Sequence, residues 1–198
     1  MQSAVPIQLG AVEDLQELHR SLTGKIFLAV SATAFVALSA HVSLPLTFTP
    51  VPLTLQTFAV ILVGFTLGPA LGCSAMLLYL AEGAMGLPVF SPHGPGGVAQ
   101  LLGPSAGFLL SFPLAAVAAG GLVRAIRLGR SHFPAALLAG ATASVLLFAV
   151  GASWMAHLLH LNPSAAWRLA VAPFLPGEIL KISAAAGAYT MLRRWRCT

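Results

Sequence analysis

Residues 175–192 read LPGEILKISAAAGAYTML and continue directly into residues 193–196, RRWR. An apolar run of this length, followed by arginines and a tryptophan, is typical of a transmembrane helix that ends at the lipid headgroups. Two charged side chains, Glu178 and Lys181, nevertheless lie within it. The stretch therefore predicts a membrane-spanning helix that carries an acid and a base at bilayer depth.

The rest of the chain has the composition of an integral membrane protein. Of its 198 residues, 58% are hydrophobic and 8% are charged, and the mean hydropathy is +0.89. Soluble domains carry roughly 25% charged residues. Between Lys25 and Arg124 the sole formally charged residue is Glu82. The formal net charge of +5 comes from short basic clusters between apolar runs, which favours anionic lipid headgroups over nucleic acid as their partner.

Turn-forming residues divide the chain into apolar segments, which predict an all-α integral membrane protein, a compact bundle of six transmembrane helices. The segments cover about 26–42, 53–67, 70–87, 105–123, 134–155 and 175–192. Pro45, Pro50 and Pro52 exclude a helix in the first connection. Glycines and prolines across 88–104 predict an external or partly re-entrant loop.

The distribution of lysine and arginine predicts the orientation. With both termini in the cytoplasm, that side receives Arg20, Lys25 and the arginine clusters after the fourth and sixth segments, whereas the outside receives Arg168. The expected division is a cytoplasmic arm over 1–24, a membrane domain over 25–192 and a basic cytoplasmic tail over 193–198. A cleaved leader is the alternative for the first segment, and the acidic residues of the arm argue against it.

Three ionisable side chains lie at bilayer depth, where insertion costs roughly 3 kcal/mol each. Glu178 and Lys181 are three residues apart and share one helix face. They can neutralise each other and still offer hydrogen bonds to a ligand, or they can be a structural ion pair. Glu82 is expected near the outer third of its segment, either as a ligand contact or as a carboxylate that reaches the interface.

Two further patterns have both a functional and a packing interpretation. Thr54 and Gln56 are expected to form hydrogen bonds inside the bundle, and for Thr54 a role between helices is favoured over ligand contact. The small residues Ala29, Thr33 and Ala37 recur every four positions and predict a smooth stripe. A helix of a partner or a neighbour in the same bundle can pack against it.

The sequence predicts no catalytic residue, no metal and no cofactor. The glycines at 94, 96 and 97 lack the Gly-Lys-Ser/Thr ending of a phosphate loop. His157 and His160 have metal-ligand spacing but no nearby third ligand. Two other functions stay open: an intramembrane enzyme that uses buried glutamates and histidines, and a passive channel or structural membrane subunit.

Several phrases in a fixed order resemble one known family. They are TPVPLTLQT at 49–57, LYLAEGAMGLPVF at 78–90, LGPSAGF at 102–108 and FLPGEILK at 174–181. Together they resemble the BioY family, the biotin-specific substrate-capture (S) components of energy-coupling-factor (ECF) transporters, over about 25–192. The chain departs from the common pattern with Glu178 where relatives more often have aspartate, and with Phe108 where they often have tyrosine.

The resemblance implies a six-helix S component of a bacterial cytoplasmic membrane that captures biotin from outside and releases it inside. It implies as partners a transmembrane coupling subunit and two cytoplasmic ATPases. The loop after the first helix, with Leu44, Leu46, Phe48 and Val51, is expected to cover the ligand. The expected ligand-binding residues are Glu178, Lys181, Glu82, Gln56, Thr54, Tyr79, Phe48 and Gln100. The expected docking stripe is Ala29, Thr33 and Ala37.

Biotin suits these side chains chemically. A carboxylate such as Glu178 or Glu82 can accept its ureido protons, and Lys181 can meet the ureido carbonyl or the valerate carboxylate. Which end of biotin lies deeper stays open.

Overall fold

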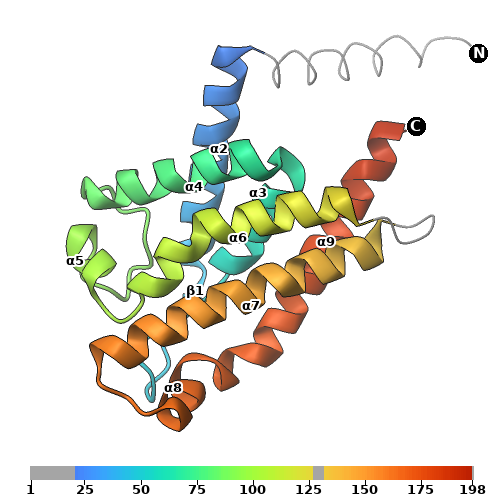
Figure 1. Ribbon diagram of the computed structural model, residues 1–198. Coiled ribbons are helices and arrows are strands. Elements are labelled where there is room, and N and C mark those ends of the chain that lie inside the picture. The colour runs from blue at the N-terminus through green and yellow to red at the C-terminus, as the bar shows by residue number, and fades with distance from the viewer. Residues whose placement is uncertain (1–20, 127–131, 198) are drawn as a thin grey trace, which may run out of the picture.

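The computed structural model describes residues 21–126 and 132–197, which form a helical bundle (Figure 1). Its longer helices are α2 (Leu22–His41), α3 (Gln56–Leu67), α4 (Pro69–Ala84), α6 (Ala106–Ala125), α7 (Phe133–Leu158) and α9 (Leu175–Cys197). Two short helices, α5 (Gly97–Leu102) and α8 (Pro163–Ala170), and the 3-10 turn η1 (Ala172–Phe174) lie in the connections. Most of the expected N-terminal arm, together with Arg127 and Arg130, lies outside the described residues.

Local sequence signals account for the helix starts. The Ser21 hydroxyl accepts a hydrogen bond from the Gly24 N–H at 3.0 Å and so caps α2. Gly68 has a φ of 88°, a value that favours glycine, and α4 begins at the next residue, Pro69. Asn162 caps α8 in the same way as Ser21 caps α2. At Gly68 the signal leaves a single residue between α3 and α4 and brings these two helices together.

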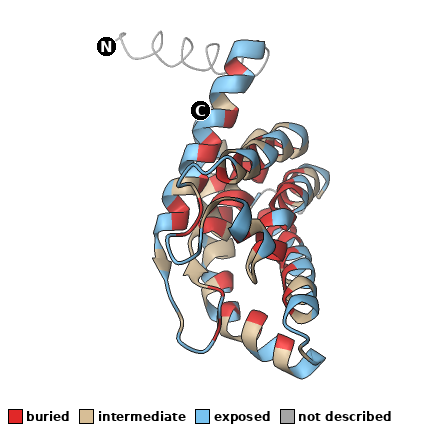
Figure 2. Cartoon of the chain, turned by 90° about the vertical axis from the view of Figure 1, so that its left-hand side faces the viewer, coloured by how far each residue is buried: buried red, intermediate tan, exposed pale blue. Residues whose placement is uncertain are grey.

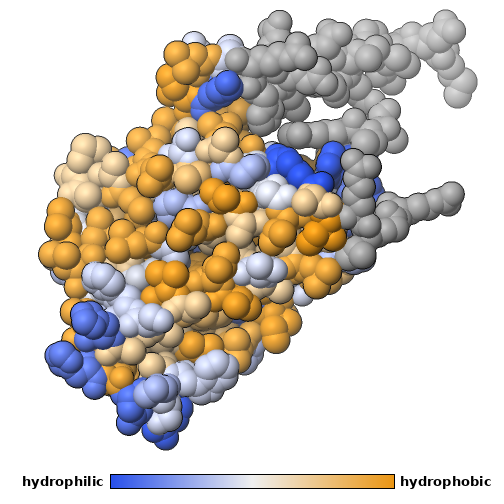
Figure 3. All heavy atoms as spheres, in the orientation of Figure 1, coloured by the Kyte–Doolittle hydropathy of each residue, from blue (hydrophilic) through white to orange (hydrophobic). Residues whose placement is uncertain are grey.

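The predicted class, an all-α multi-pass membrane protein, agrees with the helix lengths and composition. Four helical stretches are long and apolar enough to cross a membrane, namely Leu22–His41, Ala106–Ala125, Phe133–Leu158 and Pro163–Trp195. Gln56–Leu67 is a shorter apolar helix. The space-filling view shows a largely hydrophobic surface, with hydrophilic residues gathered at lower left and beside the grey atoms at right (Figure 3).

The first connection contains strands that the sequence analysis did not predict. Strand β1 (Ser43–Leu44) pairs antiparallel with β2 (Leu53–Thr54), in the register Ser43 to Thr54 and Leu44 to Leu53. The expected start of the second helix at about residue 53 is therefore wrong, and Thr54 belongs to a strand. The reason is that backbone groups here find partners across the connection, as in the 3.0 Å bond from Leu55 N–H to Val42 O.

Other helix ends also differ from the predicted segments. The third helix ends at Ala84 and not at about 87, and the loop over 88–104 contains α5. The polar connection 157–173 contains α8, while α7 extends to Leu158. The last helix runs through to Cys197, so that the backbone of residues 193–197 continues α9.

Helix α6 is central to the packing and contacts α3, α4 and α7. In turn, α9 packs on α3 and α7, and α2 packs on α3 and α4. A Cβ on Gly64 of α3 would lie 2.7 Å from the Ala116 carbonyl oxygen of α6, so these backbones approach as closely as glycine permits. Buried residues line the inner faces of the helices, and exposed ones lie on the outside (Figure 2).

Candidate ligand-binding site

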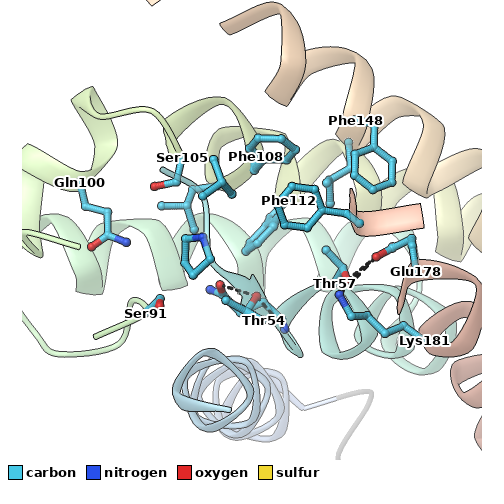
Figure 4. A pocket seen from close by; sticks show the side chains of 16 residues that line it. Thr54, Thr57, Ser91, Gln100, Ser105, Phe108, Phe112, Phe148, Glu178 and Lys181 are labelled. Carbon is cyan, nitrogen blue, oxygen red and sulfur yellow. Dashed lines mark hydrogen bonds and ion pairs between the residues drawn. The ribbon is translucent and has the colours of Figure 1, made fainter. Parts of the chain in front are cut away.

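A cavity lies where the first turns of α3, α6 and α9 meet the connection between α2 and α3. Its empty space, with the mouth included, is about 560 Å³. The lining residues are Val51, Pro52, Thr54, Gln56, Thr57, Ser91, Gln100, Ser105, Phe108, Leu109, Phe112, Leu147, Phe148, Phe174, Glu178 and Lys181. Polar groups lie at both ends, with aromatic rings between them (Figure 4).

Glu178 anchors one end of the cavity from the first turn of α9. Only 2% of the residue is exposed. The Ser144 hydroxyl of α7 donates to its Oε1 at 2.7 Å, and the Thr57 hydroxyl of α3 donates to its Oε2 at 2.9 Å. Each carboxylate oxygen thus has a donor from a different helix, which stabilises the charge in a buried position.

Lys181 lies one helical turn further along α9. Its Nζ is 3.4 Å from Glu178 Oε2, and the side chain is 11% exposed. Both residues also line the cavity and are drawn at its edge in Figure 4. The pair is therefore an ion pair within α9 and part of the cavity wall at once, while the bonds of Glu178 to Ser144 and Thr57 join α9 to α7 and α3. A lysine ammonium has three N–H donors, so this contact leaves donors for a ligand.

The opposite end carries neutral polar groups. The Gln100 side chain, on α5, accepts a bond at Oε1 from the Gly96 N–H at 3.1 Å. A Cβ on Gly94 would lie 2.5 Å from that Oε1, so glycine there gives the amide room. Ser91 is buried, and its hydroxyl has no hydrogen-bond partner among the described residues. An unpartnered buried hydroxyl in a cavity wall is suited to bind a polar ligand atom.

A hydrogen-bonded chain holds the middle of the site. Thr54 Oγ1 donates to Gln56 Oε1 at 3.1 Å, and Gln56 Nε2 donates to the Tyr79 hydroxyl at 2.7 Å. That hydroxyl donates to the Val89 carbonyl oxygen at 2.8 Å. Tyr79 lies completely buried behind the wall and does not line the cavity. It fixes Gln56 instead of contacting the cavity directly.

Four phenylalanines line the cavity, one of them Phe174 of η1. Phe108 and Phe112 come from α6, and Phe148 comes from α7 (Figure 4). The rings of Phe108 and Phe148 meet edge to face with centroids 6.3 Å apart. Their faces suit a fused apolar ring system held between two polar ends.

Five of the expected ligand-binding residues line this cavity, namely Glu178, Lys181, Gln56, Thr54 and Gln100. The other three do not. Tyr79 lies behind the cavity wall, and Phe48 is 57% exposed at the tip of the first connection. Glu82 accepts a hydrogen bond from the Thr33 hydroxyl of α2 at 3.1 Å, and this bond joins α2 to α4.

The expected docking stripe faces the bundle. Ala29 and Thr33 are buried, and Ala37 is half-buried. The packing interpretation of this stripe therefore fits the structure for its first two members, because Thr33 bonds to Glu82 on α4. No group of three or more His, Cys, Asp or Glu side chains with metal-binding geometry occurs over 21–126 and 132–197.

Between its two strands, the first connection contributes two residues to the cavity wall. Val51 and Pro52 line the cavity, whereas Leu44 is 58% exposed. The Thr49 hydroxyl donates to the Leu169 carbonyl oxygen of α8 at 2.8 Å, which ties the connection down across the site.

The sequence analysis did not predict Thr57, Ser91 and Ser144 as residues of the site. Thr57 directly follows Gln56 in the phrase 49–57. Because the buried carboxylate of Glu178 needs hydrogen-bond donors, this nearby hydroxyl could have been predicted as one of them. Ser144 lies in an alanine-rich run two residues after Thr142, and its chain separation from Glu178 gives no sequence signal.

The fold and the cavity define a multi-pass helical membrane protein with an internal pocket that is polar at both ends and aromatic between them. The chain belongs to the BioY family, whose model matches residues 11–197.

Similar proteins agree with this assignment. A probable biotin transporter BioY of Pyrococcus horikoshii is 38% identical over 152 residues, 76% of this chain and 86% of that protein. The biotin transporter BioY of Rhodobacter capsulatus is 36% identical over 177 residues, 83% and 88% of the two chains. A crystal structure described as the S component for biotin from an ECF-type ABC transporter has a similar fold, with a TM-score of 0.78. It is 23% identical, and the alignment covers 87% of this chain and 92% of that one.

Proposed function

We propose that this protein binds biotin in the cavity and is the S component of an ECF-type transporter that takes up biotin. The observation that carries the proposal is the Glu178–Lys181 pair, a buried acid and base that form one end of an aromatic cavity. Membership of a family whose named relatives are biotin transporters supports it. The reaction is capture and release, without covalent chemistry.

The cavity matches the chemistry of biotin. Biotin has a fused apolar ring pair, a ureido group with two N–H donors and one carbonyl, and a valerate carboxylate. The aromatic rings of Phe108, Phe112 and Phe148 offer faces to the ring pair. Glu178 supplies an acceptor and Lys181 a donor at one end, and Ser91 and Gln100 supply neutral hydrogen-bonding groups at the other. Both polar ends of the ligand thus have partners.

We propose six membrane spans, with both termini in the cytoplasm of a bacterium. The cavity and the β1–β2 connection lie at one end of α3, α6 and α9, where Arg168 also lies on α8. Lys25, Arg124 and Arg193 lie at the other ends of the long helices. The positive-inside rule puts the latter end in the cytoplasm, so the cavity opens outward under the first connection.

Transport requires partners under this proposal, because no phosphate-binding loop occurs in the sequence. A transmembrane coupling subunit and two cytoplasmic ATPases would supply the energy. We place the contact with the coupling subunit on α2, where Ala37 is the stripe residue left partly uncovered.

Binding of labelled biotin to the purified full-length chain, without ATP, tests the proposal. We expect stoichiometric retention, and Lys181→Ala should weaken it about 10- to 100-fold, the worth of a hydrogen bond to a charged group. Lys25→Ala, which removes an exposed lysine at the other end of the molecule, is the matched control. Equal affinity in wild type and Lys181→Ala would remove this residue from the site. An absence of biotin retention in the folded wild type would overturn the function.

Biotin amide extends this test to the orientation of the ligand. If Lys181 meets the valerate carboxylate, its replacement should weaken biotin but hardly affect the amide. If it meets the ureido carbonyl, both ligands should weaken equally.

A further inference from the structure

A second cavity lies at the opposite end of the bundle from the biotin site. Its empty space, with the mouth included, is about 420 Å³. The last turns of three helices supply its walls, with Phe65, Thr66, Arg124, Tyr189, Leu192 and Arg193. Arg124 is in the last turn of α6 and Arg193 in the final part of α9, so the cavity lies where these apolar helices reach the membrane boundary.

Among residues 21–126 and 132–197, the two arginines of this cavity have no acidic partner. Arg124 Nη1 donates to the Gly120 carbonyl oxygen at 2.9 Å, and Arg193 Nε donates to the Tyr189 hydroxyl at 3.2 Å. The part of the chain that the structure describes contains two carboxylate side chains, and both have other partners. Glu178 pairs with Lys181, and Glu82 lies near the far end of α4. Two positive charges in one cavity without a counter-charge favour an anionic ligand.

The positions of both guanidinium groups are fixed by their surroundings. A Cβ on Gly68 would collide with the Arg124 guanidinium, which therefore lies directly over the α3–α4 turn. The Arg193 guanidinium carbon lies 5.7 Å from the centre of the Tyr189 ring, in cation–π contact. Arginines held in this way bind a phosphate group with less loss of side-chain freedom than mobile surface lysines.

An apolar groove adjoins this cavity and shares Thr66 and Leu192 with it. The groove runs between α2 and α3, and its empty space is about 540 Å³. Its other lining residues are Leu28, Ser31, Ala32, Phe35, Leu62, Val63 and Leu67. A charged cavity at the membrane boundary that shares two wall residues with an apolar groove has the two-part chemistry of a phospholipid.

We propose that this second site binds one anionic phospholipid, with its phosphate between Arg124 and Arg193 and an acyl chain in the groove between α2 and α3. Charge complementarity selects an anionic lipid over a zwitterionic one, because no acidic group among the described residues is available to a headgroup amine. The adjoining apolar groove, which shares Thr66 and Leu192 with the cavity, selects a lipid over a soluble phosphate ester. Basic pockets between transmembrane helices are known to bind anionic headgroups in this way.

Lipid retention by the purified full-length protein, measured by native mass spectrometry, tests the site. We expect wild type to retain phosphatidylglycerol in preference to phosphatidylcholine. The double variant Arg124→Gln/Arg193→Gln should lose about 25-fold in retention, from roughly a fivefold loss per arginine. Arg168→Gln, which removes the exposed arginine of α8 at the other end of the bundle, should retain the lipid normally.

Two further arms make each outcome decisive. Leu62→Trp fills the groove, leaves both arginines in place and should also reduce retention, whereas glycerol 3-phosphate should fail to displace the lipid. Displacement by that soluble ester, or normal retention by Leu62→Trp, would show a headgroup site alone and overturn the proposal. Equal retention of the two lipids by wild type would overturn it as well. Biotin binding confirms that each variant is folded. If Arg124→Gln/Arg193→Gln does not fold, Arg124→Lys/Arg193→Lys takes its place; it keeps both charges and should recover part of the lipid retention.

Discussion

The Ser144 hydroxyl of α7 donates a 2.7 Å hydrogen bond to Glu178 Oε1 of α9, and both residues are buried. This bond joins two helices through the acid that forms one end of the cavity. With the Thr57 hydroxyl on the other carboxylate oxygen, it holds Glu178 in position before any ligand arrives. The site is therefore pre-organised by residues that a ligand need not contact.

Replacement of Ser144 by alanine should destabilise the protein. A buried carboxylate would lose a charge-assisted donor, at a cost of about 2 kcal/mol. The melting temperature in detergent should fall. Ser183→Ala is the matched control, because that hydroxyl donates to the Ile179 carbonyl oxygen of its own helix. Identical melting of the two variants would show that the Ser144 bond contributes nothing to stability.

Thr49→Val should accelerate biotin release. The Thr49 hydroxyl ties the connection over the cavity to the Leu169 carbonyl oxygen, and loss of a bond worth about 1 kcal/mol should raise the dissociation rate about fivefold. A chase of labelled biotin measures this rate. Thr142→Val removes an exposed hydroxyl that bonds within α7 and should leave it unchanged. An unaltered rate in Thr49→Val would mean that this connection does not retain the ligand.

The sequence was sufficient for the all-α, multi-pass membrane class because hydropathy acts over whole segments. Some helix boundaries are set by the local backbone preferences of glycine and proline, as at Gly68, Pro69 and Pro134. Those boundaries agree with the structure. The start of α3 was misplaced because the pairing of Leu53 with Leu44 depends on residues from across the connection. Apolar composition at 53–55 does not distinguish a short strand from a helix turn.

The sequence predicted those residues of the site that carry a charge at bilayer depth. Glu178 and Lys181 stood out because an ionisable group at bilayer depth calls for an explanation. Glu82 satisfied the same criterion, yet it bonds to Thr33 on a neighbouring helix. The side of a helix that faces a cavity depends on helix rotation within the bundle, which the sequence does not encode at any single position.

Glu82→Gln and Glu178→Gln should separate these two acids. Both changes preserve shape and remove a charge. Glu178→Gln replaces an acceptor of the Ser144, Thr57 or Lys181 donors by an NH₂ group, so biotin affinity should fall by a factor of about 10 to 100. Glu82→Gln can still accept from Thr33 and should keep biotin affinity within about twofold, a change too small to indicate a lost hydrogen bond. Titration calorimetry of both variants provides the comparison, and a large loss in Glu82→Gln would place that acid in the site.

Gly151→Ala should weaken biotin binding from outside the cavity. A methyl group on Gly151 of α7 would collide with the Phe108 ring, and the ring can relieve the collision by moving toward the cavity that it lines. Gly187→Ala is the matched control, because a Cβ there meets nothing within 4 Å. That substitution should leave biotin binding intact and stabilise α9 by up to about 1 kcal/mol. Equilibrium binding and thermal melting of both variants distinguish a displaced ring from general unfolding. Unchanged affinity in a folded Gly151→Ala variant would show that Phe108 moves away from the cavity or that its position does not matter for the ligand.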